Sequence, residues 1–89
     1  MTTFRKLFAA RLKELRTAAD ISQEKFAELL GVAPKTVSYW ENGHNAVNFD
    51  KLPKIAEVLQ VPVFQLFVIA ADLVEGGNSE GVVSINDGQ

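Results

Sequence analysis

The sequence predicts an all-α fold in which five helices form one small domain. Its 89 residues suit a single core, and an apolar content of 47% is too high for a mainly disordered chain. Apolar residues recur at helical spacing in successive segments, and turns marked by glycine or proline separate these segments. We therefore expect a folded domain over residues 1–74 and a flexible acidic tail over residues 75–89.

The first helix is expected from about Thr3 to Ala18. Its apolar residues keep a helical period, with Phe4, Leu7, Phe8, Leu12 and Leu15 on one face.

Residues 22–43 have the layout of two short helices joined by a tight turn, a helix-turn-helix. Ser22 is placed to cap the first of them, and Gly31 can take the left-handed conformation that ends it. The second begins with Pro34, whose missing N–H costs nothing in a first turn, and ends at Asn42-Gly43. The residues predicted to be buried are Phe26, Ala27 and Leu30 in the first of these helices and Ala33, Val37 and Trp40 in the second.

Polar residues share the opposite face of this second helix. A rotation of about 100° per residue puts Lys35, Ser38, Tyr39 and Asn42 where a core cannot use them. These side chains are therefore free to contact a partner.

A fourth helix is expected to bury Leu52, Ile55, Ala56 and Leu59. Pro53 would remove a hydrogen bond beyond the first turn of this helix. The helix should therefore start late or bend, with Asp50 a better N-cap than Asn48.

Val61-Pro62 opens a predicted fifth helix, which is apolar on nearly every side as far as Val74. A domain this small covers only one face of such a helix, so the other face should meet a second copy of the chain. The predicted dimer interface consists of Phe64, Phe67, Val68, Ile69 and Leu73. In the tail, Val83 and Ile85 alternate with a serine, so a short strand is an alternative to a frayed end.

Several short motifs, in this order, resemble the phage-repressor and Cro-like helix-turn-helix family, which is also called the xenobiotic-response-element type. They are Arg11–Arg16 (RLKELR), Ile21-Ser22-Gln23, Ala27, Gly31-Val32, Val37-Ser38, Glu41-Asn42-Gly43, Ile55-Ala56 and Leu59-Gln60-Val61. The resemblance implies a five-helix, lambda-repressor-like domain whose third helix enters the major groove, with a dimer gripping two half-sites. It also implies a sequence-specific regulator that binds double-stranded DNA and is encoded by a prokaryote or a phage.

The base contacts are predicted on the face of the Pro34–Asn42 helix that points away from the core. Lys35 can reach guanine O6 and N7, and Tyr39 can reach a thymine methyl group with its ring or a phosphate with its hydroxyl. Thr36 and Ser38 suit either a base or a phosphate. Only apolar contact is available to Ala33 and Pro34, so either the operator is read partly through its shape or the specificity is modest.

The phosphate contacts are predicted at the start of the second helix and in the loop after the third. The resemblance suggests that Gln23 contacts a phosphate and that Glu41 pairs with Arg16, which holds the guanidinium near the DNA. Backbone N–H groups and side chains of the loop are well placed for phosphate. The predicted set is Gln23, Arg16, Asn42, Gly43, His44, Asn45 and Lys51.

The net charge of −2 argues at first against a nucleic-acid partner. However, residues 1–54 hold all nine basic and six acidic residues, a formal +3, whereas residues 55–89 hold five acidic residues and no base. The predicted reading half is therefore mildly basic, and the acidic half should face away from DNA.

Composition also bears on other functions. With no cysteine and a single histidine, His44, the chain offers no disulfide framework, no metal site of cysteine or histidine ligands and no catalytic constellation, so we expect neither an enzyme nor a cofactor. The residues from Met1 to Lys6 lack the apolar region of a signal peptide, which makes a cytoplasmic protein the default. The alternative function is a protein-interaction module or antitoxin-like adaptor that binds through the apolar fifth helix.

Overall fold

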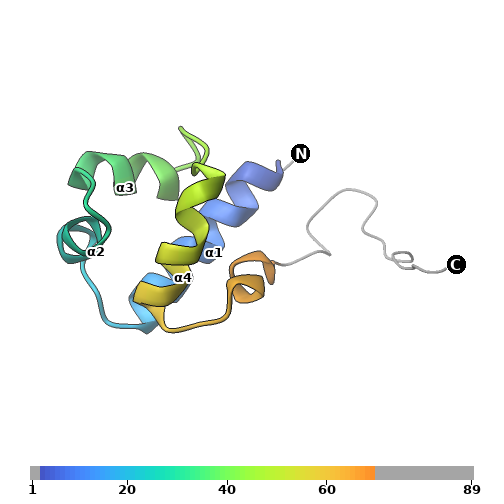
Figure 1. The fold of residues 1–89 in the computed structure, drawn as a ribbon. Helices are drawn as coiled ribbons and strands as arrows, with labels where there is room; N and C mark the ends of the chain where they lie inside the picture. Colours follow the sequence, from blue (N-terminus) through green and yellow to red (C-terminus); the bar gives the residue numbers. More distant parts are fainter. Residues whose placement is uncertain (1–2, 70–89) are drawn as a thin grey trace, which may run out of the picture.

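Residues 3–69, which the computed structural model describes, form four α-helices and two short 3-10 helices without a strand. The elements are α1 (Phe4–Ala18), α2 (Gln23–Leu30), α3 (Pro34–Glu41), η1 (Phe49–Lys51), α4 (Leu52–Leu59) and η2 (Val63–Phe67). In Figure 1, α2 and α3 lie to one side of α1 and α4, and the 3-10 helix η2 lies on the other. The all-α class is confirmed.

The capping signals predicted at Ser22 and Gly31 are confirmed, and Thr3, expected as the first residue of its helix, is instead the N-cap. The side-chain oxygens of Thr3 and Ser22 accept the N–H groups of Lys6 and Lys25 and cap α1 and α2. Gly31 ends α2 in the left-handed region, at φ +74°. The turn-forming residues therefore set the angle between α2 and α3.

One core joins all four helices and η2. Its buried residues are Phe8, Leu12, Phe26, Ala27, Val37, Trp40, Leu52, Ile55, Ala56, Leu59 and Leu66. Full burial of one such large side chain stabilises the fold by about 1.5–3 kcal/mol. Four residues expected on the core faces lie further out: Leu15 and Leu30 are half-buried, and Phe4 and Ala33, the N-cap of α3, are exposed.

The start of α4 differs from the prediction in its cap. Asn48 accepts the N–H of Asp50 at 2.8 Å and caps η1, so the preference for Asp50 as N-cap was wrong. The late start was right, because α4 begins at Leu52 and Pro53 lies in its first turn, where a missing N–H is harmless. The 3-10 turn η1 thus precedes a helix whose first turn holds the proline.

The predicted fifth α-helix is instead the 3-10 helix η2, and Val68 already leaves the helical region at φ −81° and ψ +88°. Arg11 on α1 contacts this segment: its Nε donates to the carbonyl oxygen of Gln65 at 2.9 Å, and its Nη2 donates to Oε1 of the same residue at 2.7 Å. In a continuing α-helix that carbonyl would accept the N–H of Ile69. The rest of the predicted helix, with Leu73, and the predicted tail at 75–89 lie outside the described residues.

Candidate nucleic-acid interface

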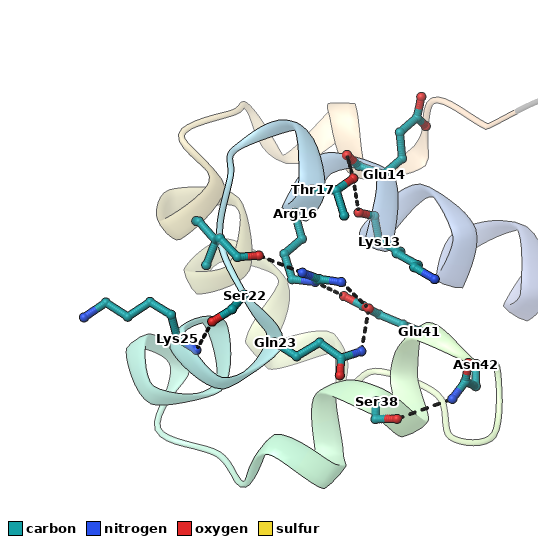
Figure 2. Close-up of polar contacts among 11 residues, drawn as sticks. Lys13, Glu14, Arg16, Thr17, Ser22, Gln23, Lys25, Ser38, Glu41 and Asn42 are labelled. Carbon is teal, nitrogen blue, oxygen red and sulfur yellow. Dashed lines mark hydrogen bonds and ion pairs between the residues drawn. The ribbon is translucent and has the colours of Figure 1, made fainter.

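The outward face of α3 carries the side chains that the sequence assigned to it. Lys35 and Asn42 are exposed, the Tyr39 side chain is 40% exposed, and Ser38 is half-buried. The amide of Asn42 donates to the hydroxyl of Ser38 at 3.4 Å (Figure 2). This face therefore offers an ammonium, a phenol, an amide and a hydroxyl to a partner.

The remaining residues predicted to contact bases lie at the start of α3. Ala33 and Pro34 are exposed, and Thr36 is half-buried. No side-chain hydrogen bond caps α3 at Ala33. Pro34 has no N–H, and the N–H of Thr36 donates to the carbonyl oxygen of Ala33 at 2.9 Å, so this end of the helix offers few backbone donors to a partner.

A buried ion pair between Arg16 and Glu41 lies on the inner side of α3 (Figure 2). The guanidinium of Arg16 donates to Glu41 through Nε at 2.6 Å and Nη2 at 3.1 Å, and its Nη1 donates to the carbonyl of Ile21 at 2.6 Å. The two charged side chains are only 9% and 1% exposed. The expected pair is present, and it ties the end of α1 to the end of α3. A phosphate contact by Arg16 itself remains a prediction with little exposed surface to act through.

Gln23 joins the same group of side chains from the first residue of α2. Its Nε2 donates to Oε1 of Glu41 at 3.0 Å, and the side chain is half-buried (Figure 2). The amide is thereby held at the N-terminus of α2, where the backbone N–H groups lack helical partners and favour an anion.

The loop after α3 differs from the expectation in one respect. The N–H groups of Asn42 and Gly43 donate to Ser38 and Trp40, and those of His44 and Asn45 both donate to the carbonyl of Tyr39. These four backbone donors are thus used within the chain, so the expected backbone contacts to phosphate are not available in this conformation.

The loop's side chains remain available to a partner. Asn42, His44 and Asn45 are exposed, and the ring of His44 packs edge-on against Tyr39 with a centroid distance of 5.7 Å. Lys51, the last residue of η1, is half-buried.

Only some of the basic side chains in residues 3–69 form ion pairs. Four of the basic side chains form ion pairs there, with Arg11, Arg16, Lys25 and Lys54 as the cations. Within the same residues Arg5, Lys6, Lys13, Lys35 and Lys51 form none. Sequence reasoning missed Lys6, which packs against Gly43 in the loop after α3. No periodicity signals this contact, because it depends on how α1 crosses that loop.

A second surface is apolar and lies away from the outward face of α3. Phe4, Phe8 and Phe67 pack together, with centroid distances of 5.5–6.4 Å. We call the cavity beside them the aromatic groove; it encloses about 380 Å³ and is lined by Phe4, Arg5, Phe8, Trp40, Asn45, Ala46, Val47, Phe49, Leu52 and Phe67. Of the other residues assigned to the predicted dimer interface, Phe64 and Val68 are 63% and 49% exposed, whereas Ile69 is half-buried.

Two further properties hold for residues 3–69. No helix in this range is both long and apolar enough to cross a membrane. The range also contains no group of three or more histidine, cysteine, aspartate or glutamate side chains that could hold a metal ion.

Comparison with known proteins gives consistent matches. The helix-turn-helix family model HTH_3 matches residues 12–66. An uncharacterised HTH-type transcriptional regulator of Sinorhizobium medicae is 36% identical over 58 residues, which are 65% of this chain and 42% of that protein. The chain thus spans less than half the length of this relative.

Solved structures agree with these matches. The restriction-modification controller protein C.AhdI from Aeromonas hydrophila superposes with a TM-score of 0.66 at 37% identity, over 70% of this chain and 94% of that one. Hydroxypropylphosphonic acid epoxidase from S. wedmorenis also matches, with a TM-score of 0.65 at 35% identity, but over only 33% of that enzyme and 70% of this chain. The likeness to the enzyme is therefore confined to a third of its length.

Proposed function

We propose, from the premise that this chain belongs to the helix-turn-helix family HTH_3, that it is a sequence-specific transcriptional regulator that binds double-stranded DNA as a homodimer. The main support is the exposed polar face of α3, which the buried Arg16–Glu41 pair holds against the rest of the domain. An ordered helix with a polar outer face suits the major groove, which admits one α-helix. The family model matches residues 12–66, and the relative described above is a transcriptional regulator, so we do not propose an enzymatic role.

The base contacts are assigned to α3. Lys35 and Tyr39 lie one turn apart on the exposed face and reach furthest from the helix. Lys35 would donate to guanine, and Tyr39 would contact a thymine methyl group or a phosphate. Ala33, Pro34, Thr36 and Ser38 approach the groove closely but add few polar contacts, so part of the specificity would come from the shape of the DNA.

The phosphate contacts are assigned to the two ends of the motif. At one end, Gln23 and the N-terminus of α2 would bind a phosphate. At the other end, the side chains of Asn42, His44, Asn45 and Lys51 would bind the neighbouring backbone. For Gly43, the structure supports a conformational role.

Dimerisation is proposed through η2 and the residues after it. Phe64, Phe67 and Val68 form an exposed apolar surface on this side of the domain, and such a surface is typical of a contact between proteins. A dimer would place two copies of α3 about 34 Å apart, one turn of DNA, on a two-fold symmetric operator. Repression by excluding RNA polymerase is the simplest outcome, and the cytoplasm is the proposed location.

The deciding experiment is selection from a randomised DNA pool, followed by fluorescence-anisotropy binding at two salt concentrations. The expected result is a two-fold symmetric site that the Lys35→Ala variant no longer enriches. If binding is weak, disappears with salt and enriches no sequence, the proposed function is wrong.

The aromatic groove favours one alternative function. An open cavity lined by phenylalanines suits a protein-interaction module or an antitoxin-like adaptor better than a protein that acts through α3 alone. The selection experiment separates the two, because an adaptor without DNA specificity would enrich no symmetric site.

A further inference from the structure

Lys6 on α1 lies directly against Gly43 in the loop that follows α3. A Cβ atom added to Gly43 would lie 3.2 Å from Cγ of Lys6 and 3.8 Å from its Cα. Gly43 also adopts a φ of +77°, which side chains disfavour. The glycine therefore serves two purposes: it turns the chain, and it lets the lysine's aliphatic stem cross the loop at close range.

This packing places Lys6 beside the loop at the edge of the proposed DNA surface. Lys6 is exposed and forms no ion pair with any of residues 3–69, so its ammonium is free to bind an anion. A lysine stem that lies along a surface commonly presents its charged end to the solvent beyond that surface. Here the surface is the loop Asn42–Asn45, which joins α3 to the next element.

The backbone N–H groups of the same loop are not available to a phosphate. The backbone N–H groups of Asn42, Gly43, His44 and Asn45 all donate to carbonyl groups of α3. Apart from its neutral amides, only the His44 imidazole remains, and that ring packs against Tyr39. A lysine or arginine charge beside the loop must therefore come from another element, and Lys6 is packed against the loop at Gly43.

We infer that Lys6 is a phosphate-binding residue that contacts the DNA backbone next to the loop Asn42–Asn45. This inference rests on the proposed function, since it needs α3 to enter the major groove. Its ligand is a backbone phosphate group. It makes the first turn of α1 a third point of attachment to DNA, beside the N-terminus of α2 and the loop side chains.

The test replaces the charge and keeps the packing. In Lys6→Met the unbranched stem still lies against Gly43, but the ammonium is gone. The matched control is Arg5→Met, which removes the same charge from the neighbouring position, where the side chain lines the aromatic groove. Both variants and the unchanged protein are titrated with two DNA duplexes. One has about 30 base pairs of arbitrary sequence, and the other is the selected operator. Each titration is repeated over a series of salt concentrations.

The expected result is specific to Lys6. Lys6→Met lowers affinity about three- to tenfold on both duplexes and reduces the slope of log K against log salt by about 0.9 for each phosphate that the protein no longer neutralises. Arg5→Met changes the slope much less. Lys6→Arg retains most of the slope, because a guanidinium also binds phosphate.

Other outcomes overturn the inference in distinguishable ways. Equal slopes for Lys6→Met and the unchanged protein would show that Lys6 does not bind a phosphate, and equal reductions in Lys6→Met and Arg5→Met would mean that only long-range charge matters. Both results leave the proposed function standing. If the unchanged protein itself binds neither duplex, the proposed function fails first.

Discussion

The carboxylate of Glu41 accepts two hydrogen bonds from the guanidinium of Arg16 in the interior, although the two residues lie 25 positions apart in the chain. Gln23 donates a third bond to the same carboxylate at 3.0 Å. Three helices therefore meet at one charged group, and the face that we propose to bind DNA is held in place by polar contacts as well as by the apolar core.

Removing one partner of this pair should be costly. Glu41→Leu leaves a guanidinium that is 9% exposed without its anion, so we expect a loss of about 3–5 kcal/mol in the free energy of unfolding. Urea denaturation followed by circular dichroism measures it. The double variant Arg16→Met/Glu41→Leu should recover much of the loss, since no unpaired charge remains buried. Strictly additive losses would show that the pair is not coupled.

Gln23→Ala should weaken binding to all DNA sequences alike. The variant removes the proposed hydrogen bond from Gln23 to a phosphate, which is worth about 1 kcal/mol or about fivefold in affinity. It also removes the bond from Gln23 to Glu41, but the Arg16–Glu41 pair keeps that carboxylate satisfied. Fluorescence anisotropy with the operator and a scrambled duplex measures the effect. A loss on the operator alone would reassign Gln23 as a residue that reads bases.

Lys35→Ala should instead relax the preference for particular bases. A lysine donating to guanine contributes about 1–3 kcal/mol of discrimination at one base pair, so that position should become variable in a repeated selection. Tyr39→Phe, which keeps the ring, separates contact with a methyl group from hydrogen bonding by the hydroxyl. An equal loss on every sequence would make Lys35 a phosphate contact.

Phe64→Asp should prevent self-association while leaving the monomer folded, because the Phe64 side chain is already 63% exposed. Sedimentation equilibrium is expected to give a dimer for the unchanged chain and a monomer for the variant. Leu29→Asp makes a comparable change on α2, at a residue that is 43% exposed, and should leave the mass unchanged. An unchanged mass for Phe64→Asp would place the interface elsewhere or remove it.

Substitution of Asn48 and of Asp50 should affect the free energy of unfolding differently, because only Asn48 caps η1 in the structure. Asn48→Ala should lower the free energy of unfolding by about 1 kcal/mol, because its side chain accepts the N–H of Asp50. Asp50→Ala should change it by less than about 0.5 kcal/mol. Thermal or urea denaturation of the two variants decides between them, and a larger loss for Asp50→Ala would favour Asp50 as the cap.

Signals within a few residues of each other predicted the first three helices well. Ser22, Gly31 and Pro34 act on their own turns, so the surrounding fold barely changes what they do. The polar outer face of α3 followed from helical periodicity in the same way. For Asn48 and Asp50 the local rule was ambiguous, because both are good capping residues.

Contacts between distant segments account for the rest. The run from Val63 to Phe67 has no local signal that favours a 3-10 helix. Arg11, 54 positions away, donates a hydrogen bond to the carbonyl oxygen of Gln65 within this run. The crossing of Lys6 over Gly43 likewise depends on the packing of α1 against the loop. Neither arrangement leaves a periodic trace in the sequence.

Trp40 is the only tryptophan in the chain, and its ring both belongs to α3 and lines the aromatic groove. The wavelength of indole emission depends on the polarity around the ring, so the protein contains an intrinsic optical reporter on the inner face of α3, beside the groove. A molecule that fills the groove should therefore change the fluorescence without any attached dye, and a movement of α3 on DNA could be followed in the same signal.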